Sequence, residues 1–216
     1  MLKQIYDITI PITTKTIVWP GDPVVAIRQI AAISKGAESN LSQIRMSVHT
    51  GTHIDAPAHF IAGGKTIGDI SLGKLTGQVL VVEMGQDVEV ITDQCLLNHP
   101  QLEAIRKARK VLFKTRNSQL WREDSAKFTE DYVGADSSAA AFLADLDLDL
   151  IGIDYLSISP FNDLDEPHRI LLAKNIILLE GTDMSRVPAG HYQLYCLPMK
   201  LESCEGAPVR AILREI

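Results

Sequence analysis

Apolar and polar positions alternate with a period of two near the start of the chain, and this pattern predicts extended strands. The alternation covers residues 2–12 and returns at 42–48, and residues 24–33 form a further strand candidate between them. Pro11 ends the first strand because proline cannot donate to a strand ladder. The N-terminal part of the chain is therefore predicted to be β-structure, with a turn at residues 19–23.

Further along the chain, short apolar runs alternate with segments of helical spacing. Thr92 is suited to open one helix, and residues 102–110 and 137–143 predict further helical segments. This order of strands and helices is typical of an α/β or mixed architecture. The runs predicted as buried strands are residues 78–84, 111–115, 150–154 and 175–180.

Composition limits the classes of function without identifying one. The 216 residues are 46% hydrophobic and 22% charged, which is ordinary for a soluble chain, and we predict a single domain over residues 1–216. A net charge of −6 without a basic run argues against nucleic acid as a partner and favours small molecules. No apolar run reaches the length of a membrane span, and no signal-like segment opens the sequence, so we expect a cytoplasmic protein.

The three cysteines, Cys95, Cys196 and Cys204, are odd in number and lack C-x-x-C spacing. This usage suits a reducing compartment better than a disulfide framework. We expect all three to be structural, with Cys204 as a candidate exposed thiol.

One segment is dense in side chains that bind metals. His49, His53, Asp55 and His59 all stand at odd positions, so an extended backbone would direct them to one face. A lone histidine is usually a structural group. A tight cluster of imidazole and carboxylate groups, in contrast, suits zinc or manganese. Without an ion, such a cluster would leave buried polar groups without partners. His59 could be a ligand, a proton carrier or a group that supports a ligand.

The same segment must bend to bind an ion. In a straight strand His49 and His53 would stand about 13 Å apart, too far for two nitrogens that each lie about 2.1 Å from one metal. Gly51 and Pro57 are the candidate positions for the bends. A helical alternative resembling H-E-x-x-H fails, because the glutamate is missing and the residues between are poor helix formers.

Three residues outside this segment are candidates for the same site. Trp19, on a loop stiffened by proline and glycine, is either a hydrophobic plug or a wall for a flat aromatic ligand. His168 follows a polar loop at 157–167 and is either a surface helix histidine or a ligand. Glu180 is the last residue of an apolar strand and is either a solvated charge or a ligand. The ligand alternative is favoured because functional side chains often lie at strand ends.

The spacing H-x-G-T-H-x-D-x-P-x-H at 49–59 resembles the signature of the cyclase-like metal-dependent hydrolase family, which includes bacterial kynurenine formamidases (arylformamidases) and isatin hydrolases. The similarity extends to residues 19–22, Asp154, 197–200 and 207–211. It implies a mixed α/β fold with a central barrel-like β core flanked by helices, of the swivelling β/β/α type. It also implies a homo-oligomer, a dimer or a tetramer.

The resemblance implies two divalent metal ions per chain, Zn²⁺ with Mn²⁺ as the alternative. His49, His53 and Asp55 would bind the first ion. Asp55 would bridge to the second ion, which His168 and Glu180 would hold. Two such ions would lower the pKa of a shared water from about 15.7 towards neutrality and polarise a carbonyl.

The resemblance also implies a reaction. His59 would be the catalytic acid–base and Trp19 would line the pocket, and the expected activity is hydrolysis of N-formylkynurenine to kynurenine and formate. Arg169 departs from the formamidase pattern, which tends to carry a second histidine there, and this leaves the substrate open. One alternative is the opening of a cyclic amide such as isatin, and an alternative of another class is a non-catalytic protein that binds a metal or a small ligand.

Overall fold

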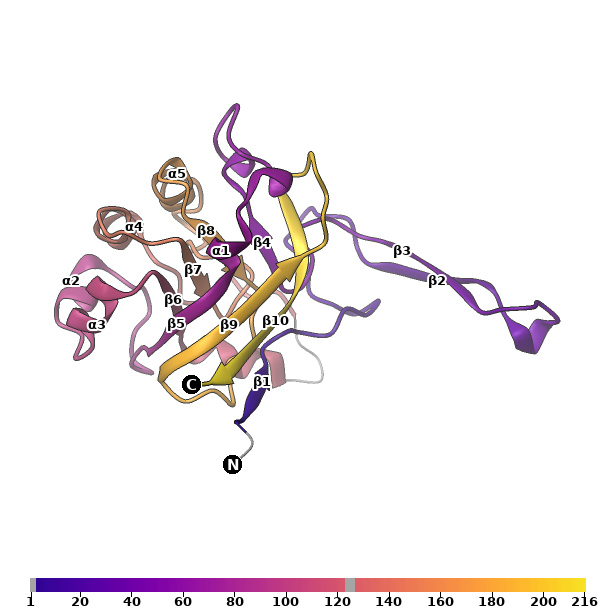
Figure 1. Cartoon of the computed structure of the whole chain (residues 1–216), viewed down its shortest axis with the longest axis horizontal. Coiled ribbons are helices and arrows are strands. Elements are labelled where there is room, and N and C mark those ends of the chain that lie inside the picture. The colour runs from indigo at the N-terminus through magenta and orange to yellow at the C-terminus, as the bar shows by residue number, and fades with distance from the viewer. Residues whose placement is uncertain (1–2, 123–126) are drawn as a thin grey trace.

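A closed β-barrel forms the centre of the computed structural model, which describes residues 3–122 and 127–216 (Figure 1). Strands β5 to β8 run parallel to one another, whereas the remaining barrel strands are antiparallel to their neighbours. In order around the barrel the strands are β4 (His53–Asp55), β8 (Ile177–Glu180), β7 (Leu150–Ile153), β6 (Lys110–Lys114), β5 (Thr76–Glu83), β9 (Gly190–Pro198) and β10 (Gly206–Glu215).

Strand β10 closes the barrel because its two halves pair with different strands. Its first residues, Gly206–Pro208, pair with β4, and the stretch from Val209 to Glu215 pairs with β9. The short strand β1 (Ile5–Asp7) adds to the free edge of β10 opposite β9. Closure removes the open edges of these strands.

Two hydrophobic cores lie on the two faces of the barrel wall. In β5, Val79 and Val81 point into a core shared with β9 and β10, whereas Leu80 and Val82 pack in a second core with the helices. This burial on both faces explains why residues 78–84 are almost continuously apolar. The helices of the second core lie together on one side of the barrel in Figure 1: α2 (Asp93–Leu97), α3 (Leu102–Lys107), α4 (Ser137–Ala144) and α5 (Asp165–Ala173).

Local signals explain where several of these helices begin. The Thr92 hydroxyl accepts a hydrogen bond from the Cys95 amide at the start of α2, and the Asp136 carboxylate accepts one from the Ala139 amide at the start of α4. The other helical segments are α1 (Leu72–Leu75) and the 3₁₀ turns Ile33–Lys35, Pro57–His59, Ile67–Asp69 and Arg116–Arg122.

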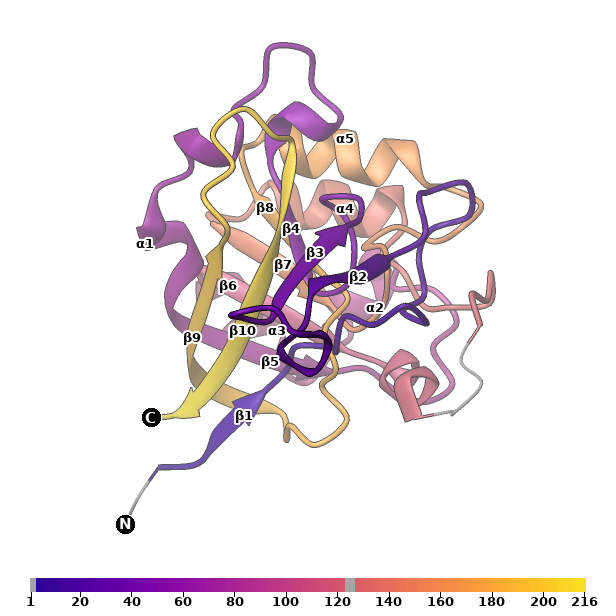
Figure 2. The same cartoon turned by 90° about the vertical axis from the view of Figure 1, so that its right-hand side faces the viewer.

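A two-stranded hairpin, β2 (Ala26–Ala31) with β3 (Leu41–Arg45), projects from the barrel on the side away from the helices (Figures 1 and 2). Its strands are antiparallel, with a register shift between Gln29 and Ala31. This hairpin is the part of the molecule that extends furthest from the barrel in Figure 1.

The expected mixed α/β fold with a barrel core and flanking helices is confirmed, while several boundaries are wrong. The first strand is limited to Ile5–Asp7, and beyond it Thr9 forms only an isolated bridge, with Thr182. The helix expected over 102–110 stops at Lys107, since Lys110 already begins β6. Strands β9 and β10 were not predicted, although β9 alternates between buried and more exposed residues.

Two smaller expectations can also be compared with the structure. The three cysteines are free thiols, and Cys204 is partly exposed. No helix in the described part of the chain is long and apolar enough to cross a membrane.

Candidate functional site

The site is built on the outer face of two neighbouring barrel strands. In β4, Ile54 points into the core shared with β9 and β10, so His53 and Asp55 on either side of it point outwards. Glu180 is the direct cross-strand partner of His53, and Leu178 is that of Asp55. Pairing of β4 with β8 therefore brings residues more than a hundred positions apart onto one face.

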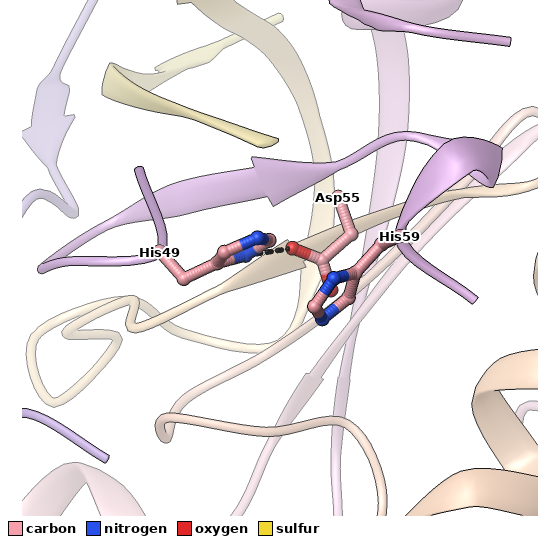
Figure 3. Close-up of side chains that lie close together, drawn as sticks. All are labelled: His49, Asp55 and His59. Atoms are coloured by element: carbon pink, nitrogen blue, oxygen red, sulfur yellow. Dashed lines mark hydrogen bonds and ion pairs between the residues drawn. The ribbon is translucent and has the colours of Figure 1, made fainter. Parts of the chain in front are cut away.

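The bends expected in this segment are present at both positions. Gly51 has φ of 73°, a conformation that residues with a Cβ rarely adopt, and it turns the chain into β4. Pro57 opens the 3₁₀ turn that carries His59. These bends bring His49 back to Asp55, with 2.8 Å between Nδ1 and Oδ1, and place His59 beside them, as Figure 3 shows.

His168 reaches the site from α5 and is buried, at 3% exposure, so the surface alternative is wrong. Its Nδ1 lies 2.7 Å from the Leu164 carbonyl oxygen, which can only accept, so Nδ1 carries the proton. Its Nε2 then presents a lone pair 3.3 Å from Glu180 Oε1 and 3.9 Å from Asp55 Oδ2.

His53 repeats this arrangement from β4. Its Nδ1 lies 2.9 Å from the Gly51 carbonyl oxygen, which fixes the same tautomer. Its Nε2 is 3.5 Å from Asp55 Oδ1 and 3.5 Å from Glu180 Oε2. Lone pairs of neutral imidazole facing buried carboxylate oxygens repel one another, so this geometry requires a proton or a cation between them.

Unpaired polar atoms point to a cation. His49 Nε2, Asp55 Oδ2 and Thr50 Oγ1 are buried without a hydrogen-bond partner. Within the described residues, the potential ligand atoms gather in two groups whose members lie within 4.8 Å of one another, and Asp55 belongs to both. The donor set of imidazole and carboxylate therefore fits two neighbouring divalent ions that share Asp55. The two groups are His49 with Asp55 and His59, and His53 with Asp55 and Glu180.

Without metal, the pKa values of His49 and His168 are raised, so these side chains hold protons at positions where cations would bind. Burial would lower the pKa of His49, but the Asp55 carboxylate raises it to about 9. Burial disfavours ionised Asp55, yet the imidazoles, His49 first, lower the pKa of its carboxyl. For His168, burial would lower the pKa, but Glu180, Asp55 and the Leu164 carbonyl together raise it. For His59 burial prevails and lowers the pKa.

These side chains line a pocket of about 350 Å³ that also contains Trp19. The Trp19 ring packs against Phe161, with ring centroids 5.8 Å apart, and belongs to an aromatic cluster with Tyr132 and Phe128. Asp22, from the 19–22 segment, and Phe60, directly after the 49–59 segment, also line the pocket. Sequence reasoning did not single out the other lining residues, because they come from separate loops with no shared spacing. They are Ser47, Leu156, Ser157, Leu164 and Glu205.

Comparison with known proteins places the chain in a family. Residues 6–160 match a family model described as "Putative cyclase". The chain belongs to the cyclase family. Cyclase-like protein 3 of rice (Oryza sativa subsp. japonica) is 36% identical over 192 residues, which cover 85% of this chain and 68% of that protein. A kynurenine formamidase of Salinibacter ruber is 34% identical over 215 residues, covering 97% of this chain and 96% of that protein.

Solved structures agree with this membership. A protein described as a "predicted metal-dependent hydrolase" from Bacillus stearothermophilus is 30% identical and superposes with a TM-score of 0.82 over the whole of both chains. Isatin hydrolase A of Labrenzia aggregata, at 20% identity, has a TM-score of 0.83 over 99% of this chain and 94% of its own, which shows a shared fold.

Arg169, the position expected to depart from the formamidase pattern, lies outside the residues that line the pocket. Its Nη1 donates a hydrogen bond to the Phe60 carbonyl oxygen at 2.9 Å, and its guanidinium lies over the Phe60 ring. That ring stacks on His168, with centroids 4.6 Å apart. Arg169 therefore supports a pocket wall through its contacts with Phe60.

Replacement of Gly206 by alanine is expected to displace the His49 ring. A Cβ at this position would lie 2.5 Å from His49 Cε1, closer than such atoms approach. Because the ring must shift away from Asp55, we expect metal affinity to fall about 10- to 100-fold, as when a group that orients a ligand is lost. Chelator competition measures the effect. Gly73→Ala is the control, since its Cβ would meet only Ser71 Oγ at 3.6 Å, and equal affinities for the two variants would contradict the prediction.

Proposed function

We propose that this chain is a metal-dependent amidohydrolase that cleaves the formamide bond of a small aromatic substrate, N-formylkynurenine, to give kynurenine and formate. His49, His53 and Asp55 would hold one divalent ion. Asp55 would be shared with a second ion that His168 and Glu180 would hold. The ions are Zn²⁺, with Mn²⁺ as an alternative that this donor set also accepts.

The observation that carries the proposal is that Asp55 belongs to both groups of potential ligands. These groups differ from the proposed ligand sets, because His53 is grouped with Glu180, and His59 stands with His49. The proposal is supported by the 34% identity to a kynurenine formamidase over nearly the full length of both chains. When bound, divalent ions lower the pKa of water and polarise a carbonyl.

His59 moves the proton in this proposal. Burial lowers the pKa of its imidazole, so the ring is neutral at pH 7 and can accept a proton from water as the oxygen–carbon bond forms. The same proton passes to the leaving nitrogen as the carbon–nitrogen bond breaks, which avoids an amine anion. The His59 ring stacks on His49, with centroids 4.0 Å apart, so it lies beside the proposed ligands.

The pocket suits an aromatic substrate that carries an amino group. Trp19, which packs against Phe161, offers a flat apolar wall for a ring. Asp22 and Glu205 also line the pocket, and no lysine or arginine is among its described lining residues. A substrate with an ammonium group, such as N-formylkynurenine, therefore finds a complementary charge that isatin would not use.

Metal analysis together with turnover tests this function. We expect two equivalents of divalent ion in the purified protein, activity on N-formylkynurenine above that on isatin and formanilide, and loss of activity on chelation that Zn²⁺ or Mn²⁺ reverses. A protein with no stoichiometric ion and no activity after metal addition would refute the proposal. Bound metal without turnover on any of the three substrates would support a non-catalytic binding protein instead.

The double substitution Glu205→Gln with Asp22→Asn is expected to raise KM for N-formylkynurenine by about tenfold. This is the magnitude expected when a charged hydrogen bond is lost at a partly exposed site. Formanilide has the formamide but no amino-acid group, so its KM should stay unchanged in the same variant. Steady-state kinetics on both substrates measure the difference. An equal rise for both would mean that these carboxylates support the pocket without selecting the substrate.

We also propose that the protein assembles as a homo-oligomer, for which the projecting hairpin offers a surface.

A further inference from the structure

Asp154 directly follows β7 and is a buried carboxyl group that the proposed mechanism does not use. Four donors converge on it. Its Oδ2 accepts hydrogen bonds from the Thr115 amide at 2.8 Å, from the Ser118 amide at 3.0 Å and from the Ser118 hydroxyl at 2.6 Å. Its Oδ1 accepts a fourth, from the Thr115 hydroxyl at 2.8 Å. A buried charge needs such partners, so these three residues form one polar unit.

The ionised form of Asp154 is the one that matches these four donors. Burial raises the pKa of its carboxyl group to about 6, although the hydrogen bonds from Ser118 and Thr115 oppose this rise. The group is therefore ionised at neutral pH, and a carboxylate offers acceptors only. An asparagine in its place would direct an N–H group towards other donors.

The donors belong to the start of the 3₁₀ turn Arg116–Arg122, and Trp121 connects the far part of this turn to the same strand exit. Trp121 Nε1 donates to the carbonyl oxygens of Asp154 and Thr182, both at 3.0 Å. The Trp121 ring also packs against the buried ring of Tyr155, with centroids 5.4 Å apart. Asp154 therefore holds the turn through its side chain and through its main chain.

Asn117, inside this turn, connects it to the segment that carries Tyr132. Asn117 Nδ2 donates to the Val133 carbonyl oxygen, and Asn117 Oδ1 accepts from the Val133 amide, each at 2.8 Å. Tyr132 is buried, and its ring packs edge-on to Trp19, with centroids 6.5 Å apart. Hydrogen bonds and ring contacts thus connect Asp154 to Trp19 without a gap.

Both ends of this connection reach the pocket. Trp19 lines it, and so do Leu156 and Ser157, which follow Asp154 by two and three positions. The aromatic cluster around Trp19 is separate from the two hydrophobic cores of the barrel wall. Parts of a protein outside its main cores can open at a lower free energy than the whole fold. This side of the pocket can therefore loosen while the barrel stays folded.

We propose that Asp154 is a positioning residue that holds the Trp19 side of the pocket in place and thereby sets a preference for substrates with an aromatic ring. It touches neither substrate nor metal and acts through the turn at 116–122. A wall that is ordered before the substrate arrives lowers the entropy lost on binding. The inference rests on the proposed function for its kinetic test and deepens it by naming what selects the ring.

Steady-state kinetics of Asp154→Asn test this role. We expect KM for N-formylkynurenine to rise about tenfold, the order expected when hydrogen bonds to a charged group are lost, with kcat and metal content unchanged. N-formylglycine is a competitor that has the formamide but no ring, so its inhibition constant should stay the same. An equal rise in both constants would overturn the proposal, because it would indicate a general structural role.

Asp136→Asn is the matched control. Asp136 also accepts hydrogen bonds at the start of a helix, from the Ala139 amide and the Ser138 hydroxyl, but it does not line the pocket. This variant should match the natural chain in both constants.

Tryptophan fluorescence needs no turnover, so it separates this inference from the proposed function. The chain has two tryptophans, Trp19 and Trp121, and both belong to the aromatic cluster. We expect acrylamide to quench their fluorescence about twofold more strongly in Asp154→Asn, because the cluster opens more often. Unchanged quenching would overturn the role of Asp154. A natural chain that does not hydrolyse N-formylkynurenine would refute the proposed function alone.

Ser118→Ala keeps the test decisive if Asp154→Asn does not fold. It removes one hydroxyl donor and leaves the carboxylate with its three other hydrogen bonds. We expect a rise of about threefold in KM for N-formylkynurenine, the order of one hydrogen bond, and an unchanged inhibition constant for N-formylglycine. Unchanged KM together with unchanged quenching in this variant would overturn the proposal.

Discussion

Replacement of Asp55 by asparagine is expected to remove bound metal and to lower kcat/KM at least about 1,000-fold, beyond the 10- to 100-fold loss typical of groups that only orient a ligand. Asp55 is 1% exposed and belongs to both groups of potential ligands, so in the proposed site its charge would serve two cations at once. Asparagine keeps the shape of the side chain but supplies no negative charge, and a neutral amide is a poor ligand for both ions.

Metal content after dialysis and turnover on N-formylkynurenine measure this effect. Asp147→Asn is the matched control, because Asp147 is an exposed carboxylate that is not among the pocket-lining residues, and this variant should match the natural chain. Retention of both ions together with more than about a tenth of the natural turnover would contradict a bridging role for Asp55.

Titration of the metal-free protein gives a second, independent measure of the same substitution. The pKa of His49 is about 9 because the Asp55 carboxylate outweighs burial. Without that carboxylate only the smaller contributions of Glu180 and Glu205 oppose burial, so we expect the pKa of His49 to fall in Asp55→Asn, as followed by NMR. A raised histidine pKa contributes stability that is complete below about pH 6.5 and is lost as pH rises through about 9, so this contribution should vanish in the variant.

Replacement of His59 by asparagine is expected to lower kcat about 100- to 10,000-fold while both ions stay bound, because a general acid–base contributes in that range. In the proposed mechanism the imidazole of His59, whose pKa is lowered by burial, moves a proton, and asparagine cannot do so at neutral pH. The pH profile of kcat should also lose the titration that His59 contributes.

Chelator competition distinguishes this role from that of a ligand. His59 belongs to one of the two groups whose potential ligand atoms lie close together, so a ligand role is the direct alternative. If His59→Asn loses an ion at a chelator concentration that the natural chain withstands, His59 is a ligand and not the proton carrier. The exposed His191 offers the control His191→Asn, which should keep both metal and rate.

Much of the fold could be predicted because burial leaves a signature in local sequence. Strands β5 to β8 are buried on both faces, so they appear as continuous apolar runs, and Thr92 marks the start of α2 through its cap. Strands β9 and β10 were missed because no similar run marks them, and their partners lie far away along the chain. The closure of the barrel depends on those pairings and is therefore a tertiary property.

For the site, the sequence alone determined the chemistry of the 49–59 segment and the need for its bends, because alternation and the placement of Gly51 and Pro57 are local properties. Only the tertiary structure decided which residues join that segment. Cross-strand pairing brings Glu180 beside His53, and the packing of α5 buries His168. Glu205 reaches the pocket because the next residue, Gly206, pairs with Asp55 of β4. No spacing in the sequence encodes such contacts between distant segments.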